Sequence, residues 1–515
     1  MNRIVVYHIF CISLLILISQ PALSQQVNIQ GNNELKWADG LEELSGESTS
    51  KRYFENRLNL DLYYDKIRFG SRFTMLQPSE FGQEISGVET FEKRFLEFRD
   101  PDNDMYFRVG NFYTVWGRGL SLALSEDITQ GFDSGLDGVL AGGDWEFFEA
   151  EVISGRSDAG HLGLVREAQI SGANISAAIL DNATLGALVV LTDSVGLSTY
   201  TENRTWGGYG SYDGSYVSVW AEHSMEFVTG VDEDNYASYA SISGFYDNIG
   251  IALDYKNYNY YWYGSRGANS AYAASTGVLP FHSPPIVQRE FTSNLFSKHP
   301  HLIKYEDEVG AQLEITWSPG SWGTMVLAYA QSSSHPENDA PIPSLKEVDS
   351  PYRELFLEVN AYPGWDAALS GWGGWSEEVI YYRLSDVRQR WRNQAVLGGR
   401  LEMPVFGQFS EIVSAEGMIV SDKILDKSFP EARFEAGGVY KANYSLVASL
   451  EMSDENEKDY GFETWFNVQG RAMIAGRHEL IFMYGQERGG LVCSSGKCRV
   501  VTPFNGVKIS LISLF

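Results

Sequence analysis

Residues 53–75 read YFENRLNLDLYYDKIRFGSRFTM, and this stretch decides the fold. Residues on one parity of its first half are largely apolar, those on the other largely polar: Phe54, Asn56, Leu58, Leu60, Leu62 and Tyr64 alternate with Tyr53, Glu55, Arg57, Asn59 and Asp61. The polar pair Asp65-Lys66 then marks a turn, and the alternation resumes from Ile67 to Met75. A period of two over segments of about ten residues predicts a β-hairpin with one apolar face.

The same alternation recurs along the chain. It is clear over residues 105–110, 308–317, 354–359 and 400–403, and no long stretch has the period of a helix. Alternation alone does not decide the class of protein, because a soluble β-sandwich or β-helix alternates as well. Two further features distinguish these folds.

The first feature is the end of the chain. Phe515 is preceded at intervals of two by Ser513, Leu511, Ile509 and Val507. This last apolar strand resembles the signal that outer-membrane barrels present to their assembly machinery. We therefore predict that Phe515, Leu511 and Ile509 form a C-terminal assembly signal, with the barrel assembly machinery as a partner.

The second feature is the alternation of connection lengths. Short connections are predicted at 65–66, 101–104, 247–248, 318–321, 362–365, 404–405 and 442–444, and long polar ones at 38–52, 77–92, 262–305, 334–350, 376–390, 419–429 and 488–499. Outer-membrane barrels have short periplasmic turns and long extracellular loops. The sequence therefore predicts an all-β protein, a single transmembrane antiparallel β-barrel of about 20–24 strands. Outer-membrane lipid is then its surrounding partner.

Residues 1–24 have the pattern of a cleaved Sec signal peptide, with Arg3, an apolar segment at 4–18 and Ala-Leu-Ser at 22–24. A transmembrane anchor is the alternative, but its apolar run of about 15 residues is shorter than the roughly 20 that a span needs. Residues 25–515 then form one barrel domain in the bacterial outer membrane, without a separate plug domain. The net charge of −28 excludes nucleic acid as a partner, since phosphate binding needs a basic face.

Removal of the signal peptide also removes Cys11 and leaves Cys493 and Cys498. Two cysteines so close together in an exported protein predict a disulfide loop. A metal-binding pair is the alternative, and it lacks a third ligand nearby. The histidines of His299-Pro300-His301 could also bind a metal, but the sequence identifies no carboxylate that would join them as a further ligand. We therefore predict no metal site and no cofactor.

Charged residues on the polar parity of the clearest strands are predicted to face the lumen, because an Arg facing lipid near the midplane costs about 2–4 kcal/mol. The candidates are Glu55, Arg57, Asp61, Arg68, Arg72, Arg108, Glu308, Glu314, Glu354, Glu358, Arg400 and Glu402. Adding Glu435, Glu451, Glu463 and Arg433 gives ten acids against six arginines. Such groups either pair in a lattice that holds the wall together or line water, in which case the excess of acids predicts a mild cation preference.

The longest predicted loop, 262–305, is the candidate constriction of the lumen; a loop lying at the surface is the alternative. Its residues 287–297, after Pro284-Pro285, are predicted to form a short helix. The aromatic run 258–263 is interpreted as part of the aromatic girdle at the membrane interface, with a sugar-stacking platform as the alternative. Glycines 110, 117 and 119 are interpreted as positions where a strand bends or the backbone enters the lumen.

Three segments carry a resemblance to a known family. Gly110-Asn111-Phe112-Tyr113 followed by Trp116-Gly117-Arg118-Gly119-Leu120, the loop from Pro284-Pro285 to His299-Pro300, and the cysteine pair near the end are similar to motifs of an uncharacterised family of Bacteroidota outer-membrane proteins. The resemblance implies an outer-membrane barrel. It assigns no activity and no functional residue.

The sequence predicts a porin-like channel through which small polar solutes diffuse. The alternative is a closed structural or interaction barrel that presents acidic loops to proteins, glycans or divalent ions. Enzymatic activity is not predicted: the local pairings His223-Ser224 and Ser333-Ser334-His335 have no third partner that the sequence identifies. The solute and the oligomeric state do not follow from the sequence.

Overall fold

The computed structural model describes residues 27–44, 47–82, 85–161, 164–195, 200–230, 232, 235–260, 279–336, 340–364, 366–381, 389–422, 427–455, 463–494 and 497–515. The predicted signal peptide, residues 1–24, lies outside these residues. Within the described part of the chain, no helix is long and apolar enough to cross a membrane.

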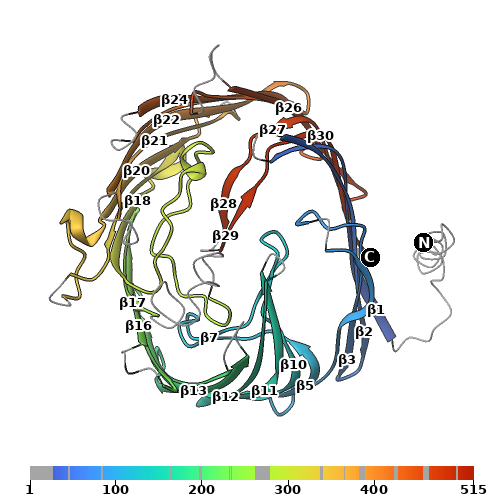
Figure 1. Ribbon diagram of the computed structural model, residues 1–515, viewed down its shortest axis with the longest axis vertical. Coiled ribbons are helices and arrows are strands. Elements are labelled where there is room, and N and C mark those ends of the chain that lie inside the picture. Colours follow the sequence, from blue (N-terminus) through green and yellow to red (C-terminus); the bar gives the residue numbers. More distant parts are fainter. Residues whose placement is uncertain are drawn as a thin grey trace.

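The wall of the protein is a closed antiparallel barrel of 24 strands (Figure 1). They are β1 (Val27–Leu44), β2 (Glu47–Tyr64), β3 (Ile67–Leu76), β4 (Gly87–Asp100), β5 (Met105–Phe112), β10 (Leu136–Trp145), β11 (Phe148–His161), β12 (Leu164–Leu180), β13 (Ala183–Val195), β14 (Tyr200–Asp213), β15 (Val217–Val228), β16 (Asn235–Tyr246), β17 (Ile249–Asn259), β18 (Glu308–Trp317), β19 (Gly323–Ser333), β20 (Tyr352–Ala361), β21 (Ala368–Tyr381), β22 (Gln389–Phe406), β23 (Phe409–Asp422), β24 (Lys427–Tyr440), β25 (Tyr444–Ser453), β26 (Glu463–Ile474), β27 (His478–Glu487) and β30 (Phe504–Leu514). Each pairs with its neighbours in this order, and β30 pairs with both β27 and β1, which closes the barrel. The fold class predicted from the sequence is confirmed.

Side chains along each wall strand alternate between a buried inward face and an exposed outward face. In β23, Ile412, Glu416 and Met418 are buried, whereas Val413 and Ile419 are 44% and 58% exposed. Exposed apolar side chains in this number are unfavourable in water, but they are the surface that a barrel presents to lipid. The alternation therefore follows from a membrane on one side of the wall and protein or water on the other.

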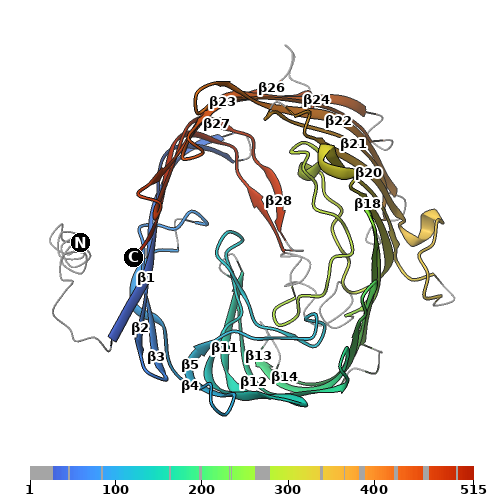
Figure 2. The ribbon, with the colours of Figure 1, turned by 180° about the vertical axis from the view of Figure 1, so that it is seen from behind.

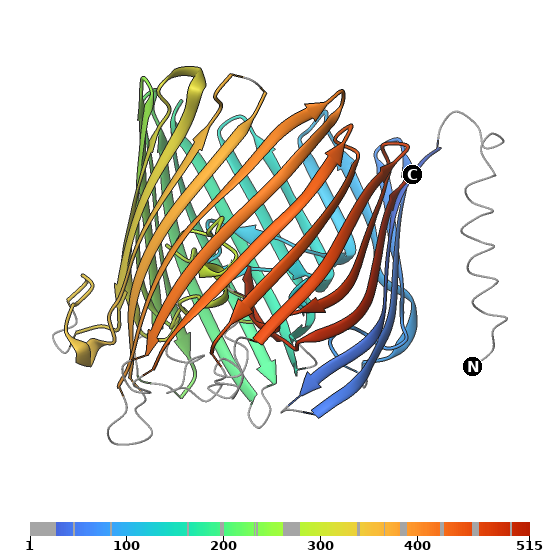
Figure 3. The same ribbon diagram turned by 90° about the horizontal axis from the view of Figure 1, so that it is seen from above.

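The two ends of the barrel differ in their connections (Figure 3). Short turns such as 65–66, 101–104 and 247–248 lie at the end where β1 begins and β30 ends, and the long connections lie at the opposite end. Several short turns use aspartate with a positive φ, as at Asp65 and Asp247, with φ of 51° and 53°. Aspartate tolerates this left-handed conformation, so the turn residues themselves favour these positions.

Four predicted long loops are wrong in their bounds, because the strands are longer than the sequence predicted; in one of them, 77–92, residues 87–92 belong to β4. Residues 38–52 belong mostly to β1 and β2, which pair in register as far as Leu44 and Glu47. Similarly, 376–390 and 419–429 shorten to the connections 382–388 and 423–426. Strands that extend beyond the lipid-facing belt carry polar residues at no cost, so polar composition does not indicate a loop there.

Two predicted short turns are displaced. Pro404-Val405 lies within β22, and the chain turns instead at residues 407–408, where Gly407 has a φ of 56°. The ladder between β22 and β23 shifts register between Pro404 and Phe406, which accommodates a proline that lacks the N–H for regular pairing. The turn predicted at 442–444 begins one residue earlier, at Lys441.

Three long connections reach far into the barrel, as the views from its two ends show (Figures 1 and 2), and the connection between β3 and β4 also lies inside the wall, where Glu80 pairs with Arg499 at 3.0 Å. We name the three long connections inner loop 1 (residues 113–135), inner loop 2 (279–307) and inner loop 3 (488–503). They contain β6 (Val115–Trp116), β7 (Leu122–Ala123), β8 (Glu126–Asp127), β9 (Phe132–Asp133), the 3-10 helix η1 (Phe296–Lys298), β28 (Gly490–Ser494) and β29 (Lys497–Val501). Two further 3-10 turns, η2 (Gly320–Trp322) and η3 (Glu347–Asp349), lie between wall strands. The buried apolar clusters lie mainly where these loops meet the wall.

Candidate channel interior

Inner loop 1 is held largely by apolar packing. Trp116, Leu122 and Leu124 are almost fully buried in one cluster with wall residues such as Ile170 and Leu188. The Trp116 indole Nε1–H donates to a Glu151 carboxylate oxygen at 2.7 Å. Fully burying a side chain of this size contributes about 1.5–3 kcal/mol each, so apolar burial is a large part of what holds this loop. Ion pairs add to it, because Arg72 of the wall donates to both carboxylate oxygens of Glu126, at 2.5 and 2.9 Å.

The glycines of inner loop 1 allow its backbone to approach the wall closely. Gly117 has a φ of 60°, and a Cβ placed there would lie 2.4 Å from the Glu222 carboxylate. Glu222 accepts hydrogen bonds from the backbone N–H groups of Arg118, at 2.6 Å, and Leu120, at 3.3 Å. The interpretation that glycine lets the backbone enter the lumen agrees with this geometry.

Inner loop 2 is held by charged hydrogen bonds to glutamates of the wall. Arg289 donates from Nη1 to Glu314 at 2.8 Å and from Nη2 to Glu358 at 3.0 Å. Glu416 accepts from the Ser293 hydroxyl at 2.7 Å. Because hydrogen bonds to charged groups contribute about 1.5–3 kcal/mol each, these contacts fix the path of the loop.

Two of the three histidines of inner loop 2 each contact a buried wall carboxylate. His299 Nε2 lies 3.2 Å from Glu431, and His301 Nδ1 lies 2.8 Å from Glu378. His301 also lies 3.5 Å from Glu308, and its ring stacks on Tyr352 with centroids 4.2 Å apart. The carboxylates that the sequence did not identify near this motif therefore come from distant strands.

His301 is fully buried among these groups. Burial by itself disfavours the charged imidazolium, but the carboxylates of Glu308 and Glu378 outweigh it, so the pKa of His301 lies above its usual value of 6.5. Among the described residues, no group of three or more His, Cys, Asp and Glu side chains has an arrangement that could hold a metal ion. His299 and His301 contact carboxylates of the wall as hydrogen-bonding partners in this geometry.

A buried ion pair supports the same region from the wall. Lys256 Nζ lies 2.6 Å from Glu308, and both side chains are at most 2% exposed. Lys256 also donates to the Ile286 carbonyl at 2.7 Å, and the Lys304 N–H donates to Glu308 at 2.6 Å. Two charges so far from water are tolerable only when further hydrogen bonds satisfy them, and inner loop 2 supplies those bonds.

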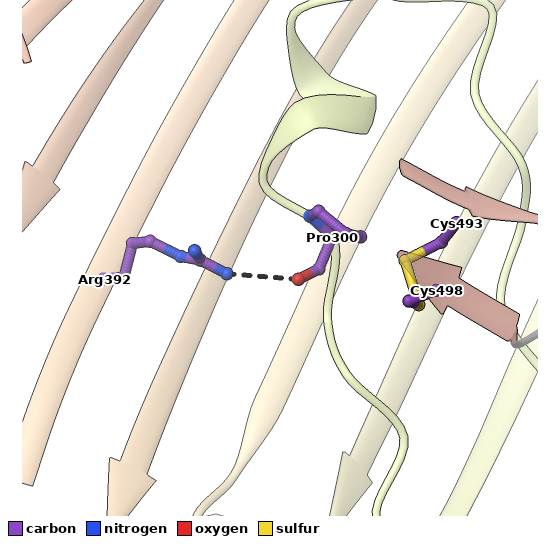
Figure 4. Close-up of a disulfide and its surroundings, with 4 residues drawn as sticks. All are labelled: Pro300, Arg392, Cys493 and Cys498. Carbon is purple, nitrogen blue, oxygen red and sulfur yellow. Dashed lines mark hydrogen bonds between the residues drawn. A yellow bond between two sulfur atoms is a disulfide. The ribbon is translucent and has the colours of Figure 1, made fainter. Parts of the chain in front are cut away.

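Inner loop 3 is a disulfide-linked hairpin in which Cys493 bonds to Cys498, the pair predicted from the sequence. Figure 4 shows this disulfide beside Pro300 of inner loop 2, whose carbonyl accepts a hydrogen bond from Arg392 Nη2 at 3.3 Å. At its base, Arg488 pairs with Glu431 at 2.5 Å and with Glu451 at 3.1 Å. A cavity of about 240 Å³ between inner loops 2 and 3 is lined by both cysteines, Arg289, Glu290, Pro300 and His301.

The twelve predicted lumen-lining residues all lie on wall strands, and each contacts a partner. Glu55 pairs with Arg57, Asp61 with Arg68, Arg72 with Glu126, Arg108 with Glu97, Glu308 with Lys256, Glu314 and Glu358 with Arg289, Glu354 with the Tyr352 hydroxyl, and Arg400 with Glu402. Some partners share a strand, some lie on the next strand and some lie on inner loops. That these residues line an open passage stays a prediction.

The sequence did not identify several anchoring residues: Glu151, Glu222, Glu378, Glu416 and Glu431 on the wall, and Arg289 and Arg488 on the loops. These glutamates lie at the inward-facing positions of their strands, and this alternation can be recognised in the sequence. Glu416, for example, alternates with exposed residues between positions 412 and 422. Periodicity carries no information about the loop that meets each glutamate, so the partners could not be predicted.

Two sequence interpretations of this region are wrong. Residues 287–297 form no helix beyond η1, because Ser293 and its neighbours turn toward Glu416 instead of continuing a helical ladder. Tyr258 and Tyr260 do not belong to the interfacial girdle: they are at most 2% exposed, and their hydroxyls donate to the carbonyls of Pro285 and Leu120. Both tyrosines lie on the side of the chain that faces the inner loops. Residues 261–263 of the same run lie outside the described residues.

The serine and histidine pairs of the sequence do not meet each other. His223 contacts Ser238, and His335 contacts Asp307 and Asn257. A different set has the connectivity of a hydrolase triad, since Ser332 Oγ lies 3.3 Å from His301 Nε2. That serine is 4% exposed, and the same Nε2 faces Glu308, so the set is part of the network that holds inner loop 2.

Comparisons with known proteins agree with this architecture. The model of a family of unknown function, DUF6029, matches residues 1–326 and 434–515. No curated protein sequence matches the chain.

Solved structures resemble it in fold. The E. coli P pilus tip assembly intermediate PapC-PapD-PapK-PapG is 10% identical with a TM-score of 0.50, over 96% of this chain and 62% of that chain. The siderophore receptor PirA from Pseudomonas aeruginosa is 10% identical with a TM-score of 0.43, over 95% and 80% of the two chains. At such identities the likeness shows the fold alone.

Proposed function

The chain belongs to the DUF6029 family of unknown function, and on that premise we propose that it is an outer-membrane channel for the diffusion of small polar solutes. In this proposal the signal peptide at 1–24 directs export, and the barrel assembly machinery recognises the strand that ends at Phe515. The Bacteroidota origin implied by the sequence motifs stays a prediction.

The observation that carries the proposal is the position of inner loop 2 between two cavities. One, of about 240 Å³, separates it from inner loop 3, and the other, of about 400 Å³, separates it from the wall. The second cavity is lined by Tyr239, Asp254, Gln288, Glu290 and Gln312. A loop held by individual side chains between two open spaces is the arrangement expected of a constriction.

A mild cation preference is the finer part of the proposal. It rests on the excess of acids over arginines on the inward parity and on the two acids, Asp254 and Glu290, beside the larger cavity. Most of the inward acids contact arginine, lysine or loop N–H groups. The preference should therefore be weak, since charges that are already paired contribute little to the potential in a pore.

A closed structural barrel is the second candidate, and one observation favours it. Leu295 and Phe296 of inner loop 2 are buried in an apolar cluster with Phe356, Met418 and Val420 of the wall. Packing of this kind gives a loop a fixed position and is suited to a stable filling of the lumen.

Single-channel recording in a planar bilayer distinguishes the two candidates. A channel gives discrete current steps, and in a KCl gradient its reversal potential has the sign of a weak cation preference. A folded, heat-modifiable barrel that stays electrically silent contradicts the channel and favours the closed barrel. Glu358→Gln, which weakens two contacts of inner loop 2, should increase current fluctuations. Its matched control is Glu402→Gln, because Glu402 pairs with Arg400 of the same strand.

A further inference from the structure

The connection between β19 and β20 contains an exposed apolar segment, residues 340–349, which we name the outer flap. Ile342, Leu345 and Val348 are 66%, 60% and 57% exposed. Figures 1, 2 and 3 show this segment, coloured gold, on the outside of the wall and not within the barrel. Large apolar side chains gathered on one short segment of a loop call for a partner, because water is a poor environment for them.

Hydrogen bonds hold the outer flap against the outward face of the wall. The Tyr255 hydroxyl donates to the Pro341 carbonyl at 2.7 Å, and the Gln331 amide donates to the Pro343 carbonyl at 3.4 Å. Tyr255 shares the parity of Leu253 in β17, and Gln331 shares the parity of Tyr329 in β19; Leu253 and Tyr329 are both exposed outward. The flap therefore doubles back over the outside of the barrel.

The contact points fix the depth of the flap. Tyr255 follows Leu253, and Gln331 follows Tyr329, by one outward position, which is roughly 7 Å along a strand. Leu253 and Tyr329, with Leu355 on β20, belong to the exposed apolar face of the wall. The flap thus lies at the edge of this lipid-facing belt, on the side of the belt nearer to the long connections.

We propose that the outer flap inserts Ile342, Leu345 and Val348 into the lipid of the outer leaflet. Continuity with the lipid-facing belt argues for lipid as the occupant, since the same surface of the wall already faces acyl chains. Lys346 and Glu347, between the apolar positions, then lie at the level of polar headgroups. Apolar side chains on a segment lying in the plane of the interface, beside charged ones, are the pattern of an interfacial anchor.

Depth-dependent fluorescence quenching tests this proposal. Among the described residues both cysteines are joined in the disulfide, so a single Cys in place of Leu345 can carry a fluorophore in the full chain. In vesicles with a spin label near the top of the acyl chains, we expect the label at 345 to be quenched several-fold more than in unlabelled lipid. Folding is checked by heat-modifiable mobility on a gel.

Two control variants set the scale. Leu397→Cys lies on the outward face of β22 and is 74% exposed, so it reports lipid in the belt; Val500→Cys lies on the hairpin of inner loop 3 and is 75% exposed, so it reports the interior. Quenching at 345 equal to that at 500 overturns the proposal. Energy transfer between labels at 345 on different copies, without quenching by lipid, also overturns it, in favour of a second copy as the occupant.

Discussion

Inner loops 1 and 2 occupy the same barrel but are held there by different sets of contacts. Inner loop 1 buries Trp116, Leu122 and Leu124 against apolar wall residues. Inner loop 2 is held by pairs between its Arg289, His299 and His301 and glutamates on separate strands, together with Leu295 and Phe296, which are buried against the wall. The comparison teaches that each loop combines an apolar cluster with ion pairs, and that inner loop 2 differs in having histidines in those pairs, which makes it the part that pH can release.

The largest effect should come from removing inner loop 2. Replacing residues 265–300 by a short Gly-Ser linker is expected to increase single-channel conductance several-fold, because it removes the segment between the two cavities while the wall strands keep their ladders. Conductance and heat-modifiable mobility are measured on the same preparation. A folded variant with unchanged conductance would show that inner loop 2 is not the constriction.

Disrupting the apolar cluster of inner loop 1 should instead cost stability. Trp116→Ala removes a side chain that is 3% exposed, and substitutions of this kind cost about 3–5 kcal/mol. The free energy of unfolding in urea should fall by an amount of that order, and proteases should cleave inner loop 1 faster. Arg118→Gln, on the same loop but outside this apolar cluster, serves as the control and should leave both measurements nearly unchanged.

Raising the pH should loosen inner loop 2 and leave inner loop 1 in place. The pKa of His301 is raised in the folded protein, so the stabilisation from its charged form is fully present below pH 6.5 and is lost as the pH rises through the folded pKa. Trypsin cleavage after Arg289 should accelerate a few-fold between pH 6 and pH 9. In the His301→Phe variant, the cleavage rate should depend on pH only as the activity of trypsin itself does. The same pH dependence as in the parent protein would contradict a role for His301.

The smallest effect should follow from breaking the disulfide. Replacing Cys493 and Cys498 by Ser frees a hairpin that closes only a short loop, for which the loss is about 2 kcal/mol and confined to inner loop 3. The midpoint of global unfolding should stay nearly unchanged, while proteolysis within 490–501 increases. Mass spectrometry of a non-reduced digest should find the two cysteine peptides joined in the parent protein, and free thiols there would refute the disulfide.

The wall could be predicted from the sequence because its cause is local. Alternation in 53–75 reports which side of one strand faces lipid, and turn residues such as Asp65 mark where strands end. The inner loops could not be predicted in the same way, since their positions depend on contacts between residues far apart in the chain. The Ser293–Glu416 hydrogen bond is one such contact. Tyr258 illustrates the difference, because an aromatic residue at a strand end has the same sequence pattern whether it meets the membrane interface or an inner loop.

The pairing of β1 with β30 has a consequence for the order of assembly. Most wall ladders join strands that are neighbours in the chain, whereas this one joins Asn32 to Leu514, and Gly31 exchanges two backbone hydrogen bonds with Phe515. Bringing the two ends together costs the most chain entropy of any step, so we expect this seam to form last. Until then the sheet has two unpaired edges that strands of other molecules can join, which makes it prone to aggregation. The pairing of β1 with β30 removes both edges and closes the barrel.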